Sequence, residues 1–177
     1  MPCSGGAVYL RGTPFVGCNL RRCAERRIQS ETGTDSWRQQ RDWRQQLKEV
    51  GATVVIAQFG QMESLNGVEK LPQFIEAYER LIAEFADEGR RVVLVAPVPF
   101  ESAAVSQNPN ESLMAYSGAI QDMAKRQGLL YINITSLMIA TTPQRTENGY
   151  QSNELGHRMI AEMIVSGLGL PKIENEA

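Results

Sequence analysis

An apolar run that ends at a glycine, residues 53–60 (TVVIAQFG), constrains the fold of this chain more than any other feature. Its first four residues are all β-branched, and β-branched residues favour strands. A run of this kind is typical of a parallel strand that helices bury on both faces. Ligands of open parallel sheets bind outside the carboxyl ends of the strands. The polar residues after Gly60 are therefore the first place to look for a site, although a plain strand-to-helix connection has the same pattern.

Three further segments predict strands, at residues 7–10, 92–95 and 129–134. Helical spacing of apolar residues predicts the helices between them. The expected helices cover residues 34–50, 68–87, 110–126, 136–140 and the stretch after 153, with Asn110 and Asn153 as N-caps of their helices. Strands that alternate with helices predict a three-layer α/β/α sandwich around a mainly parallel sheet.

Residues 1–33 differ in composition from the rest of the chain, because they hold all three cysteines, five arginines and few large apolar residues. We expect an atypical N-terminal segment here, either weakly structured or one edge strand, and a single α/β domain over residues 34–177. Cys18 and Cys23 suggest a metal site at first sight. Zinc needs about four nitrogen or sulfur ligands, and no histidine is near, so we expect no metal and interpret the arginines as a solvated basic face.

The overall composition excludes several classes of function. A net charge of −2 argues against a nucleic-acid-binding or membrane-binding protein. No apolar run approaches the length of a membrane span, and no signal peptide is visible, which makes a cytoplasmic location the default expectation. An odd number of cysteines fits a reducing compartment better than a disulfide scaffold. The sequence gives no indication of the oligomeric state.

Common nucleotide and nucleophile motifs are absent from the sequence. It contains no GxxxxGK[ST] phosphate loop, no GxGxxG motif after a strand and no GxSxG elbow. We therefore expect no nucleotide cofactor. The polar clusters that remain lie at the ends of predicted strands or before the last helix, at residues 60–64, 97–101 and 147–151.

Three segments resemble, in the right order, sequence blocks of the SGNH (GDSL-type) hydrolase family. They are GQMES (60–64), VVLVAPVPFE (92–101) and ENGYQSNELGHRMIAE (147–162). The resemblance implies the same α/β/α sandwich, of the SGNH-hydrolase or flavodoxin-like kind, and hydrolysis of small acyl or carbohydrate esters without a cofactor. It also implies an oxyanion or ligand cleft formed by Gly60, Met62, Glu63 and Ser64.

The family's catalytic residues are substituted in this chain. The resemblance aligns Thr13 with the nucleophilic serine, Asn148 with the aspartate and Gln151 with the histidine. Met62 takes the place of an asparagine that donates to the oxyanion. Thr13 keeps a hydroxyl, but Met62 cannot donate and Gln151 cannot take a proton at neutral pH. Because removing triad members costs on the order of 10⁴ to 10⁶ in rate, the pattern indicates a divergent active site, as in a pseudoenzyme.

Other residues have both a structural and a catalytic interpretation. His157, the one histidine of the chain, is expected to cap or pack at the start of the last helix, or else to replace the missing base. Glu63 can act as a carboxylate base or accept from backbone N–H groups of the helix that follows. Asp35 and Ser36 match the family's GDS in letters only, and we interpret them as an N-cap.

Three hypotheses follow from the sequence. The first is a hydrolase of the SGNH fold whose activity is weak or lost. The second is a non-catalytic module that binds a small ligand, such as an ester or a carbohydrate, in the same cleft. The third is a chain whose first 33 residues are truncated or frame-shifted, although that alone cannot explain Met62 and Gln151.

Overall fold

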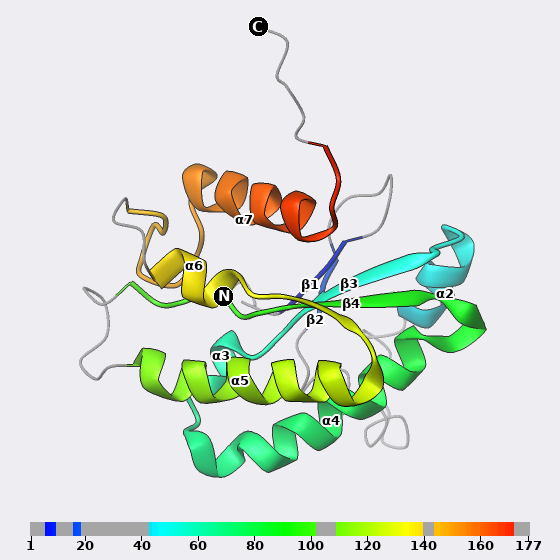
Figure 1. Ribbon diagram of the computed structural model, residues 1–177, viewed down its shortest axis with the longest axis horizontal. Helices are drawn as coiled ribbons and strands as arrows, with labels where there is room; N and C mark the ends of the chain where they lie inside the picture. Colours follow the sequence, from blue (N-terminus) through cyan, green and yellow to red (C-terminus); the bar gives the residue numbers. More distant parts are fainter. Residues whose placement is uncertain (1–5, 10–15, 19–42, 102–108, 140–143, 172–177) are drawn as a thin grey trace, which may run out of the picture.

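The computed structural model describes residues 6–9, 16–18, 43–101, 109–139 and 144–171. Its five strands form one sheet in the order β2-β1-β3-β4-β5. Three of them are parallel, β3 (Val54–Gln58), β4 (Arg91–Val95) and β5 (Leu130–Ile132). Helices cover both faces of this sheet (Figure 1). The predicted α/β/α sandwich is therefore confirmed.

The helices expected over 68–87, 110–126, 136–140 and after 153 lie close to those positions. The expected start of the 34–50 helix lies outside the described residues, and the short helix after Gly60 is not predicted by the sequence. The described helices include all of these. In chain order they are α2 (Trp43–Glu49), α3 (Gln61–Ser64), η3 (Val68–Lys70), α4 (Leu71–Phe85), η4 (Asp87–Gly89), α5 (Pro109–Gln127), α6 (Ile134–Ile139) and α7 (Glu154–Gly167). Within the described ranges, no helix is long and apolar enough to cross a membrane.

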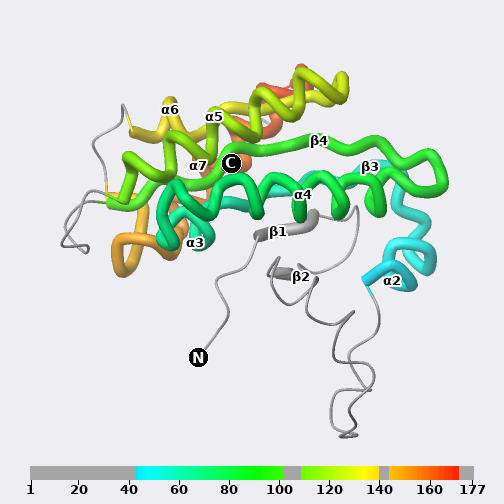
Figure 2. The backbone as a smooth tube through the Cα atoms, turned by 90° about the horizontal axis from the view of Figure 1, so that it is seen from below, coloured from blue at the N-terminus to red at the C-terminus, as the bar shows by residue number. Residues whose placement is uncertain are grey.

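Two apolar clusters hold the layers together, one on each face of the sheet. On one face, α2, α4 and α5 pack on alternate residues of β3 and β4, and α4 and α5 lie side by side (Figure 2). On the other face, α6 and α7 pack on β4 and β5. Val92 and Leu94 point into the first cluster, and Val93 and Val95 into the second. This is the two-residue period of a strand that is buried on both faces.

The sequence predicts that β3 is buried on both faces by helices. This prediction is wrong for β3, although β4 is buried in this way. Val55 and Ala57 are fully buried, whereas Val54 is 39% exposed and Ile56 is only partly buried. The reason is that the cluster under α6 and α7 is built on β4 and β5, and β3 contributes only Ile56 at its margin.

The first strand runs in a direction that the alternating pattern does not predict. β1 (Gly6–Tyr9) is antiparallel both to β3 and to β2 (Val16–Cys18). Ala7 pairs with Gln58, and Tyr9 pairs with Ile56. The carboxyl end of β1 therefore points toward the amino end of β3, away from Gly60. The domain boundary expected between residues 33 and 34 lies outside the described residues.

Of the two predicted N-caps that lie in described residues, one is confirmed and one is wrong. The Asn153 side chain accepts a hydrogen bond from the Gly156 N–H at 2.9 Å, as a cap of α7 should. Asn110 is the second residue of α5, and its side chain accepts from the Phe100 N–H at 2.9 Å and donates to the Phe100 carbonyl oxygen at 2.8 Å. Asn110 thus ties α5 to the segment that follows β4. The strand predicted over 129–134 is also shorter, since Ile134 begins α6.

Candidate functional site

Gly60 ends β3 in a conformation that only glycine adopts easily. Its φ is +109°, in the region that side chains with a Cβ rarely occupy. A Cβ here would lie 3.2 Å from Ile120 Cδ1 and 3.5 Å from Phe74 Cζ. The chain can therefore turn closely over the core and start α3 at the carboxyl edge of the sheet.

Glu63 accepts a hydrogen bond from a backbone N–H group, but the donor is Gly60, which precedes α3, and not the following helix for which the sequence suggests this role. Its Oε2 accepts from the Gly60 N–H at 3.1 Å, and the Ser64 N–H donates to the Gly60 carbonyl oxygen at 3.1 Å. Burial first, and the Glu63 charge second, raise the pKa of the Tyr78 and Tyr116 phenols. Both phenols donate to backbone oxygens, that of Tyr78 to the Ala57 carbonyl oxygen of β3 and that of Tyr116 to the Gly67 carbonyl oxygen.

The other two predicted cleft residues of α3 present few polar groups to a ligand. Ser64 is buried, and its hydroxyl donates to the Gln61 carbonyl oxygen at 2.7 Å. Met62 is half-buried, and its thioether has no hydrogen to donate. Gln61 of α3 reaches another segment, since its Nε2 donates to the Tyr150 carbonyl oxygen at 3.1 Å.

The turn at residues 148–151 lies beside α3 and carries Asn148 and Gln151, which the family resemblance aligns with an aspartate and a histidine. Asn148 Oδ1 accepts from the Gln151 N–H at 2.9 Å and from the Tyr150 N–H at 3.4 Å. Asn148 Nδ2 also approaches Gln151 Oε1, at 3.4 Å. Both side chains are exposed. Two neutral carboxamides thus lie together at this edge, and each can both donate and accept hydrogen bonds.

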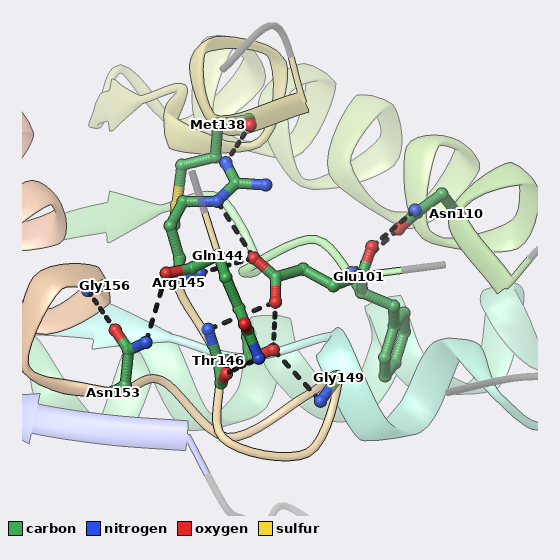
Figure 3. Close-up of polar contacts among 10 residues, drawn as sticks. Glu101, Asn110, Met138, Gln144, Arg145, Thr146, Gly149, Asn153 and Gly156 are labelled. Atoms are coloured by element: carbon green, nitrogen blue, oxygen red, sulfur yellow. Dashed lines mark hydrogen bonds and ion pairs between the residues drawn. The ribbon is translucent and has the colours of Figure 1, made fainter. Parts of the chain in front are cut away.

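A partly buried carboxylate, to which the sequence assigns no particular role, anchors this loop. Glu101, which follows β4, accepts from the Arg145 N–H at 2.6 Å and from the Thr146 N–H at 3.2 Å (Figure 3). Its own N–H donates to the Gly149 carbonyl oxygen at 2.8 Å. Sequence reasoning placed Glu101 in a polar cluster but gave no role to Arg145 or Thr146, because no spacing rule connects residues 44 positions apart.

The remaining predicted site residues are either outside the described chain or away from these contacts. Thr13 lies outside the described residues, as do Cys23, Asp35 and Ser36. No group of histidine, cysteine or acidic side chains in the described segments could hold a metal ion. His157 is exposed on α7, which is inconsistent with a packing role, and its backbone N–H donates to the Asn153 carbonyl oxygen at 2.9 Å.

Comparison by sequence finds no matching family model and no similar curated protein. Comparison of structures finds several hydrolases. A catalytic mutant of an acetylxylan esterase from Geobacillus stearothermophilus matches with a TM-score of 0.60 at 13% identity, over 76% of this chain and 67% of the esterase. An α/β hydrolase enzyme from the metagenome of Lake Arreo matches with a TM-score of 0.58 at 16% identity, over 72% of this chain.

A peptidoglycan O-acetylesterase also matches, with a TM-score of 0.58 at 15% identity, over 71% of this chain and 39% of that one. The chain spans 64% of the Lake Arreo enzyme. At these identities the likeness concerns the fold, and it agrees with the resemblance carried by residues 60–64, 92–101 and 147–162. This chain has the three-layer α/β fold of the SGNH-type ester hydrolases.

Proposed function

We propose that this protein binds a small acyl or carbohydrate ester at the carboxyl edge of its sheet and hydrolyses it weakly or not at all. The observation that carries the proposal is the pair of carboxamides, Asn148 and Gln151, in the turn that lies beside α3. A Ser–His–Asp site needs an imidazole that accepts the hydroxyl proton and a carboxylate that orients the imidazole. Neither carboxamide can perform either step.

The same two side chains are suited to binding. A carboxamide offers two N–H donors and a carbonyl acceptor, which match the hydroxyl and ester oxygens of an acylated sugar. Tyr150 lies between them in sequence and is 39% exposed, so an aromatic ring is available to the apolar face of a sugar ring. The turn thus combines polar and aromatic groups, which is common in sites that fix the orientation of a small ligand.

Two structural neighbours favour an acetylated carbohydrate as the ligand class. One is described as an acetylxylan esterase and the other as a peptidoglycan O-acetylesterase. Acetyl esters of sugars are therefore the first compounds to test on this chain.

Residual hydrolysis with Glu63 as the base is the alternative, and the contacts of Glu63 disfavour it. The carboxylate already accepts a hydrogen bond from the Gly60 N–H. A general base must instead lie within hydrogen-bond reach of the proton that it removes. Using Glu63 as a base would therefore disrupt the turn that starts α3.

The test is a calorimetric titration with an acetylated xylo-oligosaccharide, compared with the deacetylated sugar. We expect saturable binding of the acetylated compound, and an affinity about fivefold to tenfold lower in Gln151→Ala, as expected for one lost hydrogen bond. Gln127→Ala is the matched control, because Gln127 is an exposed carboxamide at the end of α5, just before the amino end of β5. Equal affinities in all three proteins, or no binding to wild type, would contradict the proposal.

A further inference from the structure

The loop that carries Asn148 and Gln151 is held by one partly buried carboxylate, that of Glu101. Glu101 Oε1 accepts from both the backbone N–H and the Nε of Arg145, at 2.6 and 3.3 Å. Glu101 Oε2 accepts from the Thr146 N–H at 3.2 Å and from the Thr146 hydroxyl. The Glu101 side chain is 18% exposed and that of Arg145 is 8% exposed. Four donors from two consecutive residues therefore converge on one partly buried carboxylate.

The Thr146 hydroxyl extends this contact into the turn itself. It donates to Glu101 and accepts from the Gly149 N–H at 3.0 Å. The Glu101 N–H donates to the Gly149 carbonyl oxygen at 2.8 Å, so both polar groups of the Gly149 backbone are fixed. Gly149 lies between Asn148 and Gln151 in the turn, and it is buried. The orientation of the exposed carboxamides therefore depends on Glu101 through Thr146 and Gly149.

Arg145 connects the same carboxylate to two helices. Its guanidinium donates to the Met138 carbonyl oxygen of α6 (Figure 3), and its carbonyl oxygen accepts from the Asn153 N–H at 2.9 Å, at the start of α7. Gly156 allows this approach, since a Cβ there would lie 2.3 Å from the Arg145 carbonyl oxygen. The segment after β4, the end of α6 and the start of α7 thus meet at one ion pair.

We propose that Glu101 is the positioning residue of the ligand site, and that it holds the 148–151 turn in the orientation that binds the ester. The proposal rests on the proposed function for the identity of the ligand. Glu101 is not a catalytic residue, because its carboxylate oxygens are bound to Arg145 and Thr146. It acts on the ligand only through the loop.

The test combines amide hydrogen exchange with ligand titration in Glu101→Gln. A glutamine has the same shape but replaces one acceptor oxygen with an NH₂ group, which would face donors of Arg145 or Thr146. We expect amide exchange in residues 145–151 to rise about tenfold relative to wild type while β4 stays protected. We also expect the affinity for the acetylated xylo-oligosaccharide to fall about tenfold. Glu84→Gln is the control, because it removes a carboxylate paired with Arg44 at a site built by α2 and α4.

A second pair of variants keeps the test valid if Glu101→Gln does not fold. Thr146→Val removes the hydroxyl that connects Glu101 to Gly149, and Thr146→Ser restores it. We expect faster exchange of the Gly149 amide and weaker binding in Thr146→Val, and recovery of both in Thr146→Ser. A role limited to filling space would not give this recovery, because valine fills the threonine site better than serine does.

Each outcome decides a separate claim. Unchanged exchange in both Glu101→Gln and Thr146→Val would overturn the positioning role. Faster exchange with unchanged affinity would overturn it as well, because the ligand would then not depend on the loop. Absence of binding to wild type, with faster loop exchange in the variants, would overturn the proposed function and leave Glu101 as the anchor of the loop.

Discussion

The Gln61 side chain donates a hydrogen bond to the Tyr150 carbonyl oxygen at 3.1 Å, and so joins residues that are 89 positions apart. One lies in α3, directly after the central strand, and the other in the turn before α7. Two segments that the sequence singles out for their resemblance to a hydrolase family are therefore in contact at the edge of the sheet where ligands of such folds bind.

This contact predicts a separation of binding from stability in Gln61→Ala. The bond is exposed, so its loss should lower the free energy of unfolding by less than about 1 kcal/mol. The affinity for an acetylated xylo-oligosaccharide should fall several-fold, because the turn is no longer fixed against α3. Gln45→Ala is the control, since the Gln45 amide donates to Glu49 within α2. Similar affinities in the two variants would show that the Gln61 contact is irrelevant to binding.

Gly60→Ala should destabilise the fold strongly for one substitution. The change forces a Cβ into the left-handed region and to 3.2 Å from Ile120 Cδ1, and we expect a loss of about 1–3 kcal/mol in the free energy of unfolding. Gly118→Ala is the matched control, because Gly118 lies within α5 with nothing near its Cβ position. That control should stabilise the protein by about 0.5–1 kcal/mol. Urea denaturation measures both, and equal effects would contradict the account of Gly60.

Asn153→Ala should cost about 1 kcal/mol of stability, because the Gly156 N–H loses its cap. Asn153→Ser should recover most of this loss, since a serine hydroxyl can accept from the same N–H. Thermal unfolding followed by circular dichroism gives both values. If alanine and serine were equally destabilising, the contact of Asn153 with the Gln144 carbonyl oxygen at 3.2 Å would matter more than the cap.

The Glu101 carboxylate should make stability depend on pH in the acid range. Burial raises the pKa of Glu101, but hydrogen bonds from Thr146 and Arg145, together with the Arg145 charge, lower it by more, so that the pKa lies below its ordinary value. Among the described residues, Arg145 is the charged group that faces it. A pKa that is lower in the folded chain means that the contribution is complete above the unfolded value and is lost as the pH falls through the folded value.

The measurement is the free energy of unfolding of wild type and Glu101→Gln across the pH range. The difference between them should be constant near neutral pH and should shrink below a pH of about 4.5. A difference that stays constant into strong acid, or grows there, would mean that Glu101 does not carry this dependence.

The layers of the fold follow from the sequence because local patterns encode them. The apolar runs before Gly60 and in residues 92–95 predict strands, and the wide apolar face of α4 predicts a helix on one side of the sheet. The direction of β1 could not be predicted in this way. A short apolar segment has the same pattern in a parallel and in an antiparallel pairing, and only its partner, β3, decides between them.

The candidate site was only partly predictable for a similar reason. Residues 60–64 and 148–151 carry a recognisable motif, whereas the contact of Glu101 with Arg145 depends on two loops that no local period connects. Asn110 shows the same limit. Its position predicts an N-cap. In the structure, both polar atoms of its side chain instead form hydrogen bonds with the Phe100 backbone.

The measurement that tests the central claim most directly is hydrolysis of a chromogenic acetyl ester by the purified wild-type protein, with Thr13→Ala and Glu63→Ala beside it. The account predicts background rates in all three, because Asn148 and Gln151 cannot transfer a proton. Turnover by wild type that disappears in Thr13→Ala would contradict it, and would mean an active esterase with a different base.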